Sequence, residues 1–132
     1  MIRRTLARLK PGSVTHEPAI SKKVFLESGE LPGLTNFSQA VFRPGDAVGG
    51  HCHEDMWEVF LVRSGRGTIR VDDVESALAE DDCWVVEPGE VHAIRNNGET
   101  DLVLLYFGLR AGSEAAYGPA RDQPGGRAHE PE

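Results

Sequence analysis

The middle of this sequence is built of short runs of β-forming residues separated by turn residues, and few folds accommodate that pattern. The runs recur between residues 24 and 109, with Gly, Pro, Asn or Asp interrupting them at intervals of roughly 8–12 residues. No internal repeat and no sustained heptad pattern accompanies them. The expected strands cover residues 24–27, 35–43, 56–62, 68–71, 83–86, 91–95 and 102–109. This pattern predicts an all-β fold, either a barrel or a sandwich.

Three turn sequences are expected to connect these strands. Asp72-Asp73 suits a tight turn between neighbouring strands. Ser64-Gly65-Arg66-Gly67 lacks the Gly-Lys-Ser/Thr ending of a phosphate-binding loop and precedes a predicted strand, so we interpret it as a hairpin turn. Asn96-Asn97-Gly98 contains residues that tolerate positive φ, and we expect a hairpin there too.

Two of the predicted strands are apolar on both faces. Successive side chains of a strand point to opposite sides, so Glu58 shares a face with Met56, Phe60 and Val62. The opposite face carries Trp57, Val59 and Leu61, and the run from 102 to 107 repeats the pattern. A half-exposed strand would instead alternate with polar residues. Something must therefore cover the second face, either the N-terminal strand or a second subunit, and we expect a homodimer.

The charge balance excludes several classes of protein. The 132 residues include 14 Lys and Arg against 21 Asp and Glu, a net charge of -7. A basic face for nucleic acid is therefore not expected. No apolar run approaches the length of a membrane span, and residues 1–10 lack the apolar stretch of a secretory signal. We expect a cytoplasmic protein whose Cys52 and Cys83 are reduced.

The two ends of the chain differ from its middle. Residues 110–132 are rich in Gly and Pro and poor in bulky apolar side chains, which predicts a flexible tail. The expected organisation is an N-terminal segment over 1–20, a β-barrel domain over 21–109 and the tail over 110–132. His16 and His129 lie in the end segments, and we interpret both as solvated side chains without a specific role.

Four residues of the central region combine into a candidate metal site. His51 and His53, two positions apart, point to the same side of an extended segment, and Cys52 points away. Glu58 lies on an apolar strand, where a lone carboxylate is costly unless it is paired or bound to a metal. His92 begins a further predicted strand. Three imidazoles and one carboxylate suit one divalent transition metal: Fe, Mn, Ni, Co, Cu or Zn. The alternative is a metal-free polar network in which the imidazoles hydrogen-bond Glu58.

The spacing of these residues resembles the first sequence motif of the cupin superfamily. The motif reads Gly45-x5-His51-x-His53-x4-Glu58-x6-Gly65 in this chain, and it matches in full.

The second cupin motif is matched in part. Its family pattern is Gly-x5-Pro-x-Gly-x2-His-x3-Asn, and this chain has Asp81-x5-Glu87-x-Gly89-x2-His92-x3-Asn96. Asp81 replaces the usual Gly and Glu87 the usual Pro, which are turn positions and not ligand positions. The resemblance covers about residues 35 to 109.

This resemblance implies a small single-domain cupin: a jelly roll or antiparallel barrel with six to eight strands, dimeric, with a metal inside one open mouth. The cupin metal ligands carry over to His51, His53, Glu58 and His92. For function we expect a metal-dependent enzyme of dioxygenase or isomerase/lyase type acting on a small polar organic molecule. Tyr106, Gln39 and Arg43 are the candidate residues for contacting it. A noncatalytic binding or sensing module, or a purely structural dimer, are the alternatives.

Overall fold

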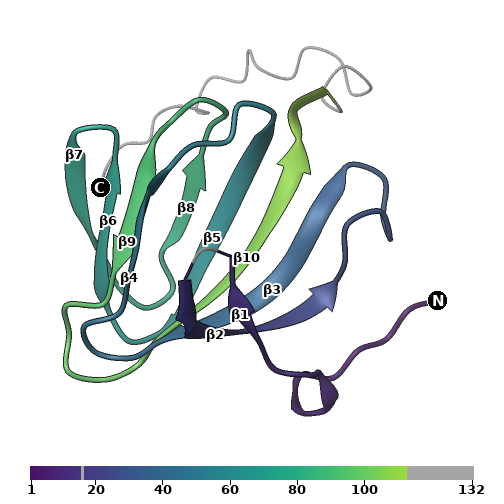
Figure 1. The fold of residues 1–132 in the computed structure, drawn as a ribbon, viewed down its shortest axis with the longest axis horizontal. Helices are drawn as coiled ribbons and strands as arrows, with labels where there is room; N and C mark the ends of the chain where they lie inside the picture. Colours follow the sequence, from purple (N-terminus) through teal and green to yellow (C-terminus); the bar gives the residue numbers. More distant parts are fainter. Residues whose placement is uncertain (16, 113–132) are drawn as a thin grey trace.

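The computed structural model describes residues 1–15 and 17–112, which form almost only β-strands (Figure 1). One 3-10 helix, η1 (Leu6–Arg8), precedes them. The strands are β1 Gly12–Val14, β2 Glu17–Leu26, β3 Leu34–Phe42, β4 Ala47–His51, β5 Met56–Ser64, β6 Gly67–Val71, β7 Val74–Leu78, β8 Cys83–Val86, β9 His92–Arg95 and β10 Leu102–Arg110. Among the described residues, no helix is long and apolar enough to cross a bilayer.

The strands form two antiparallel sheets that enclose one core. One sheet has the order β1-β2-β3-β10-β5-β8 and the other the order β4-β9-β6-β7. The chain passes from one sheet to the other six times between β3 and β10, which gives the jelly-roll arrangement seen in Figure 1. The predicted all-β jelly roll is confirmed, with ten strands where the resemblance implied six to eight.

The core is formed by one face of each strand, as the alternation of side chains predicts. In β5, Phe60 and Val62 are buried, whereas Leu61 between them is 38% exposed. The buried apolar residues from both sheets make one cluster of Ile20, Ala40, Phe42, Phe60, Val62, Ile69, Leu78, Val86, Ile94, Leu102 and Leu104. The pairing of β10 with β3 and β5 sets Tyr106 opposite both Ser38 and Phe60, so all three side chains lie on this inner face.

Two expected hairpins are wrong, because the turns in question connect the two sheets. The segment between β5 and β6 around Gly65 crosses from one sheet to the other, and so does the segment from Asn96 to Gly98 between β9 and β10. None of residues 96–98 has a positive φ. The Asp72-Asp73 turn does join paired strands, β6 and β7, and Asp72 has a φ of 54°.

Asn96 has a different role from the one expected: its side chain fastens the crossover. It is fully buried, and its amide nitrogen donates to the carbonyl oxygens of Phe42 and Thr100 at 2.9 Å each. Its side-chain oxygen accepts the N–H of Gly98. Buried amide groups are normally hydrogen-bonded, and the bonds of Asn96 join β3 to the segment just before β10.

Asp81 stands in the place of the cupin glycine. It adopts a positive φ of 71° itself.

The N-terminal strands do not cover the second face of the central strands. β1 and β2 begin before residue 21 and extend the edge of the six-stranded sheet beyond β3. On the outer face, Phe37 stacks on Phe25 with ring centroids 5.1 Å apart and meets the edge of Phe107 at 6.2 Å. Val85 remains 50% exposed and Leu61 38% exposed. His16, His129 and nearly all of the expected tail lie outside the described residues, so the domain boundaries stay a prediction.

Replacing Gly65 by Ala should lower the free energy of unfolding by about 2–5 kcal/mol. Gly65 has a φ of 82°, which costs another residue about 1–2 kcal/mol. A Cβ there would also collide with the Asp101 carbonyl oxygen, and such overpacking costs about 1–3 kcal/mol. Gly45→Ala is the matched control, because Gly45 has a φ of 92° but no heavy atom within 4 Å of a built Cβ. Urea denaturation should show the larger loss for Gly65→Ala, and equal losses would contradict the steric argument.

Candidate metal centre

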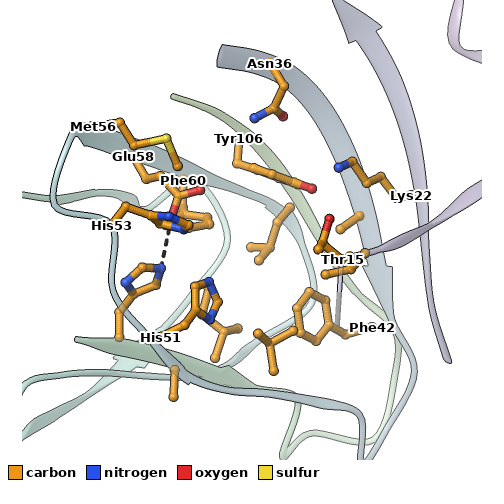
Figure 2. Close-up of a pocket in the computed structure, with 17 residues that line it drawn as sticks. Thr15, Lys22, Asn36, Phe42, His51, His53, Met56, Glu58, Phe60 and Tyr106 are labelled. Atoms are coloured by element: carbon orange, nitrogen blue, oxygen red, sulfur yellow. Dashed lines mark ion pairs between the residues drawn. The ribbon is translucent and has the colours of Figure 1, made fainter. Parts of the chain in front are cut away.

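The four residues of the expected site converge inside one end of the barrel, although they come from different elements. His51 ends β4 and pairs in register with His92, the first residue of β9. His53 follows in the connection to β5, and Glu58 lies on the inner face of β5, where it is buried. Figure 2 shows the His51, His53 and Glu58 side chains directed toward a common point at the pocket wall.

The distances within this cluster are short enough for one ion. One ligand atom from each of His51, His53, Glu58 and His92 can be chosen so that all four lie within 4.8 Å of one another. The Glu58 Oε1 atom lies 2.9 Å from His92 Nε2 and 3.9 Å from His53 Nε2. The imidazole rings of His51 and His92 are 4.6 Å apart between centroids. The sequence had brought these residues together only through face parity and the cupin resemblance.

Two atoms in this cluster lack the partners that buried polar atoms require. Glu58 Oε1 and His92 Nε2 are both buried, and neither makes a hydrogen bond to any described residue. A carboxylate oxygen and an imidazole lone pair that face each other at 2.9 Å repel, unless a proton or a cation lies between them. A proton shared by the two atoms would give the hydrogen-bonded network that the sequence left open, and a cation would give a metal site. The residues fit a cation held by nitrogen and oxygen donors.

Backbone carbonyl groups orient two of the imidazoles through their Nδ1 atoms. His51 Nδ1 lies 3.0 Å from the Gly49 carbonyl oxygen, and His92 Nδ1 lies 3.4 Å from that of Glu90. A proton on Nδ1 directs the lone pair of Nε2 into the cluster, which is the usual second contact of a metal-binding histidine. Burial acts to lower the pKa of His92, but the adjacent Glu58 carboxylate outweighs it, and the pKa is raised. The site thus attracts positive charge, either as a proton or as a metal.

The cluster opens into a cavity of about 260 Å³, close to the lower limit of small-molecule sites. Its walls near the barrel interior are apolar and include Phe42, Phe60, Ile94 and Leu104. The wall opposite the histidines is polar and is formed by Thr15, Lys22, Asn36 and Tyr106 (Figure 2). This shape suits a small molecule with one end at the cluster and the other at the polar wall.

The three residues expected to contact a ligand are placed differently. Tyr106 lines the cavity. Gln39 and Arg43 do not, because they lie on the outward-facing positions of β3 and just beyond its end. The Gln39 side-chain oxygen accepts a hydrogen bond from Arg63, and Arg43 lies 3.6 Å from Asp46. The expectation that they hold a substrate is corrected by this placement.

Cys52 and Cys83 are both free thiols. Cys52 lies between two histidines of the cluster but does not belong to it. Its thiol lies 3.6 Å from the carboxylate of Glu54. Burial and the nearby Glu54 charge raise the pKa of the Cys52 thiol, so the thiol form is favoured over the thiolate.

Lys22 is a cavity-lining residue that sequence reasoning missed. It lies between Ile20 and Val24 on one face of β2, and Ile20 is fully buried. A lysine at alternate spacing with two apolar residues signals a charged group on the inner face of a strand. That signal was present in the sequence, but the strand was expected to begin only at residue 24.

Comparison with known proteins adds to this geometry. Residues 39–108 match the family model described as "Cupin domain". The chain is 32% identical over 94 residues to an oxalate-binding protein from Thermotoga maritima, covering 71% of this chain and 74% of that protein.

Among the solved structures that share the fold, two show the extent of the likeness. A predicted oxalate decarboxylase from Thermotoga maritima aligns with a TM-score of 0.76 and 23% identity, over 83% of this chain and 99% of that one. The Cnp3 cupin domain of Schizosaccharomyces pombe aligns with a TM-score of 0.72 and 14% identity, over 88% and 79% of the two chains. At these identities the two likenesses concern the fold alone.

The phenol of Tyr106 should resist ionisation. Burial raises the pKa of Tyr106 to about 12, against the opposing effect of the Ser38 hydroxyl, and the Glu58 charge adds to the rise. At about pH 10.5 an ordinary tyrosine is more than half ionised, whereas Tyr106 should stay neutral. Ultraviolet titration of the two tyrosines in the chain should therefore show one late component that Tyr106→Phe removes. Because the folded state keeps this proton longer than the unfolded state, Tyr106 should lower stability as pH rises from about 10 to 12. Complete ionisation of both phenols near pH 10 in the folded protein would contradict this.

Proposed function

The chain belongs to the cupin domain family, and we propose that it binds one divalent transition metal ion through His51, His53, Glu58 and His92 and uses that ion to bind a small organic acid. The observation that carries this proposal is the buried pair of Glu58 Oε1 and His92 Nε2, which face each other at 2.9 Å without a hydrogen bond. A cation between them supplies the charge that both atoms lack.

The ligand set and the cavity together support an open metal site. Four protein donors leave two positions free on an octahedral ion, and no fifth donor belongs to the cluster among the described residues. When bound, the ion supplies Lewis acidity and exchangeable positions for a chelating ligand. The apolar wall around Phe60 and Leu104 limits water in the cavity, and Tyr106 presents a protonated hydroxyl to it.

Small acids are the favoured ligand class for two reasons. The 32% identical relative is named an oxalate-binding protein, and carboxylates chelate hard and intermediate divalent ions well. Lys22 and Tyr106 are the titratable residues that line the cavity outside the cluster. Neither offers a base at neutral pH, since one is an ammonium group and the other a phenol with a raised pKa. Chemistry at the metal, of dioxygenase or isomerase/lyase type, therefore suits the cavity better than proton abstraction by a side chain.

A noncatalytic binding or sensing module is the second candidate. It is favoured by the same scarcity of proton-transferring groups, because a site that binds an acid without converting it needs only the ion and the cavity. Oxygen uptake and product analysis on the metal-loaded protein separate the two candidates: turnover with any of the six metals supports an enzyme, and tight acid binding without turnover supports the module.

The proposed site is tested by metal content and by oxalate binding. Protein purified without chelators should contain about one ion per chain, and calorimetry should detect oxalate binding only in the metal-loaded form. His92→Ala and Glu58→Gln should each weaken metal binding by at least about 100-fold. Loss of a residue that only hydrogen-bonds a metal ligand already costs about 10–100-fold in metal affinity. Glu75→Gln is the control, because Glu75 is an exposed carboxylate on β7. Full metal retention in the double variant His51→Ala/His92→Ala would overturn the assignment.

We further propose that the outer face of the six-stranded sheet is the interface of a homodimer in the cytoplasm. This face carries Leu61 and Val85, 38% and 50% exposed, beside the half-buried Val59 and Leu105. Contiguous exposed apolar surface of this kind is typical of interfaces, and a self-complementary patch favours a two-fold dimer.

Leu61→Glu should convert the dimer to a monomer in sedimentation at micromolar concentration, because a charge would be buried without a partner at the centre of the interface. Val74→Glu should leave the dimer intact, although Val74 is 66% exposed, because it lies on β7 in the other sheet. A monomeric wild-type protein at high micromolar concentration would refute the interface.

A further inference from the structure

Lys22 places a positive charge on the cavity wall opposite the histidine cluster (Figure 2). We propose that the pocket selects acids that carry a second anionic group beyond the group that chelates the metal, and that the Lys22 ammonium binds this second group. The proposal rests on the proposed function, since it names the class of acid that the same metal site takes.

The position of Lys22 in the sheet turns its side chain inward. Its register partner on β3 is Ala40, a buried core residue that also lines the cavity. The next residue, Lys23, pairs with Gln39 on the outward face and donates to the Leu6 carbonyl oxygen at 3.4 Å. Two adjacent lysines therefore occupy opposite faces, and only Lys22 reaches the cavity.

The Lys22 ammonium has no counter-charge among the residues that the structure describes. It makes no ion pair or hydrogen bond to residues 1–15 or 17–112, and it is half-buried. The carboxylate on the cavity wall, Glu58, lies 3.9 Å from His53 Nε2 and 2.9 Å from His92 Nε2 and forms no ion pair with Lys22. A partly buried cation without a partner in an apolar-lined cavity is costly. An anionic group from a ligand would relieve that cost.

The separation between Lys22 and the cluster sets a minimum length for the ligand. Glu58 on β5 and Lys22 on β2 are separated by β10 and β3, which is three inter-strand spacings, or about 14 Å measured along the sheet. The barrel curves and both side chains project inward, so the gap is shorter, but Lys22 stays beyond ion-pair distance of Glu58. An acid whose two carboxylates both bind the ion, such as oxalate, would leave Lys22 unused.

Charge and hydrogen bonding at the polar wall favour the same ligand class. A divalent ion with Glu58 and Lys22 gives the site a net charge of +2, which a dianion neutralises. Thr15 and Tyr106 line the same cavity as Lys22, and their hydroxyl groups offer O–H donors to a carboxylate there. A cavity of about 260 Å³ admits a diacid of a few carbons and excludes a nucleotide-sized ligand.

The test compares two acids with the same chelating group. 2-Oxoglutarate and 2-oxopentanoate share a 2-oxo acid at one end and the same number of carbons, and they differ in a terminal carboxylate against a terminal methyl group. Calorimetry on the metal-loaded protein should show at least tenfold tighter binding of 2-oxoglutarate. Lys22→Met keeps the aliphatic stem and removes the charge, and it should bring the ratio of the two dissociation constants close to one. The affinity for 2-oxopentanoate and the metal content should not change.

Two further variants complete the design. Lys22→Arg should keep the preference for the diacid, and Lys23→Met should leave it at the wild-type value, because Lys23 faces outward. A wild-type protein that binds both acids equally, or a Lys22→Met protein that keeps the tenfold preference, would overturn the inference and leave the proposed function standing. Failure of both acids to bind the metal-loaded wild type would overturn the proposed acid binding and this inference together.

Discussion

The buried carboxylate of Glu58 is the constraint around which the rest of the barrel is arranged. No described residue donates a hydrogen bond to its Oε1 atom, and an unpaired carboxylate in an apolar interior is too costly to persist without positive charge nearby. The three imidazoles that approach it come from the opposite sheet or from the connection to it. A barrel is well suited to this convergence, because its inner faces direct side chains from distant parts of the chain into one space.

Residue parity made much of this arrangement predictable. The alternation in Met56–Val62 correctly separated the buried Glu58 and Phe60 from the exposed Leu61, and the spacing of the histidines placed them beside Glu58. Pairing between strands was less accessible, because a Gly-rich or Asn-rich turn does not encode whether the next strand joins the same sheet. The turns at 64–67 and 96–98 were expected to be hairpins for this reason, although each carries the chain to the other sheet.

The same alternation gives the six-stranded sheet two separate surfaces. Along β10, Tyr106 faces the cavity while Phe107 packs on Phe37 at the outer face. A ligand site and an apolar outer surface thus share strands but not side chains. Insertion or deletion of one residue in β5 or β10 would exchange the two sets of side chains, so both surfaces depend on the register in which β10 pairs with β5.

Three of the four residues of the polar wall lie in a different part of the chain from the metal-binding cluster, and only Tyr106 shares its region. Thr15, Lys22 and Asn36 all precede residue 39, where the match to the cupin family begins, whereas the four clustered residues lie within residues 39–108. Substitutions in the N-terminal strands can therefore change which molecule is accepted without disturbing the ion. Descendants of one ancestral gene could in this way diversify their ligands through β1, β2 and the start of β3, while inheriting the metal chemistry unaltered.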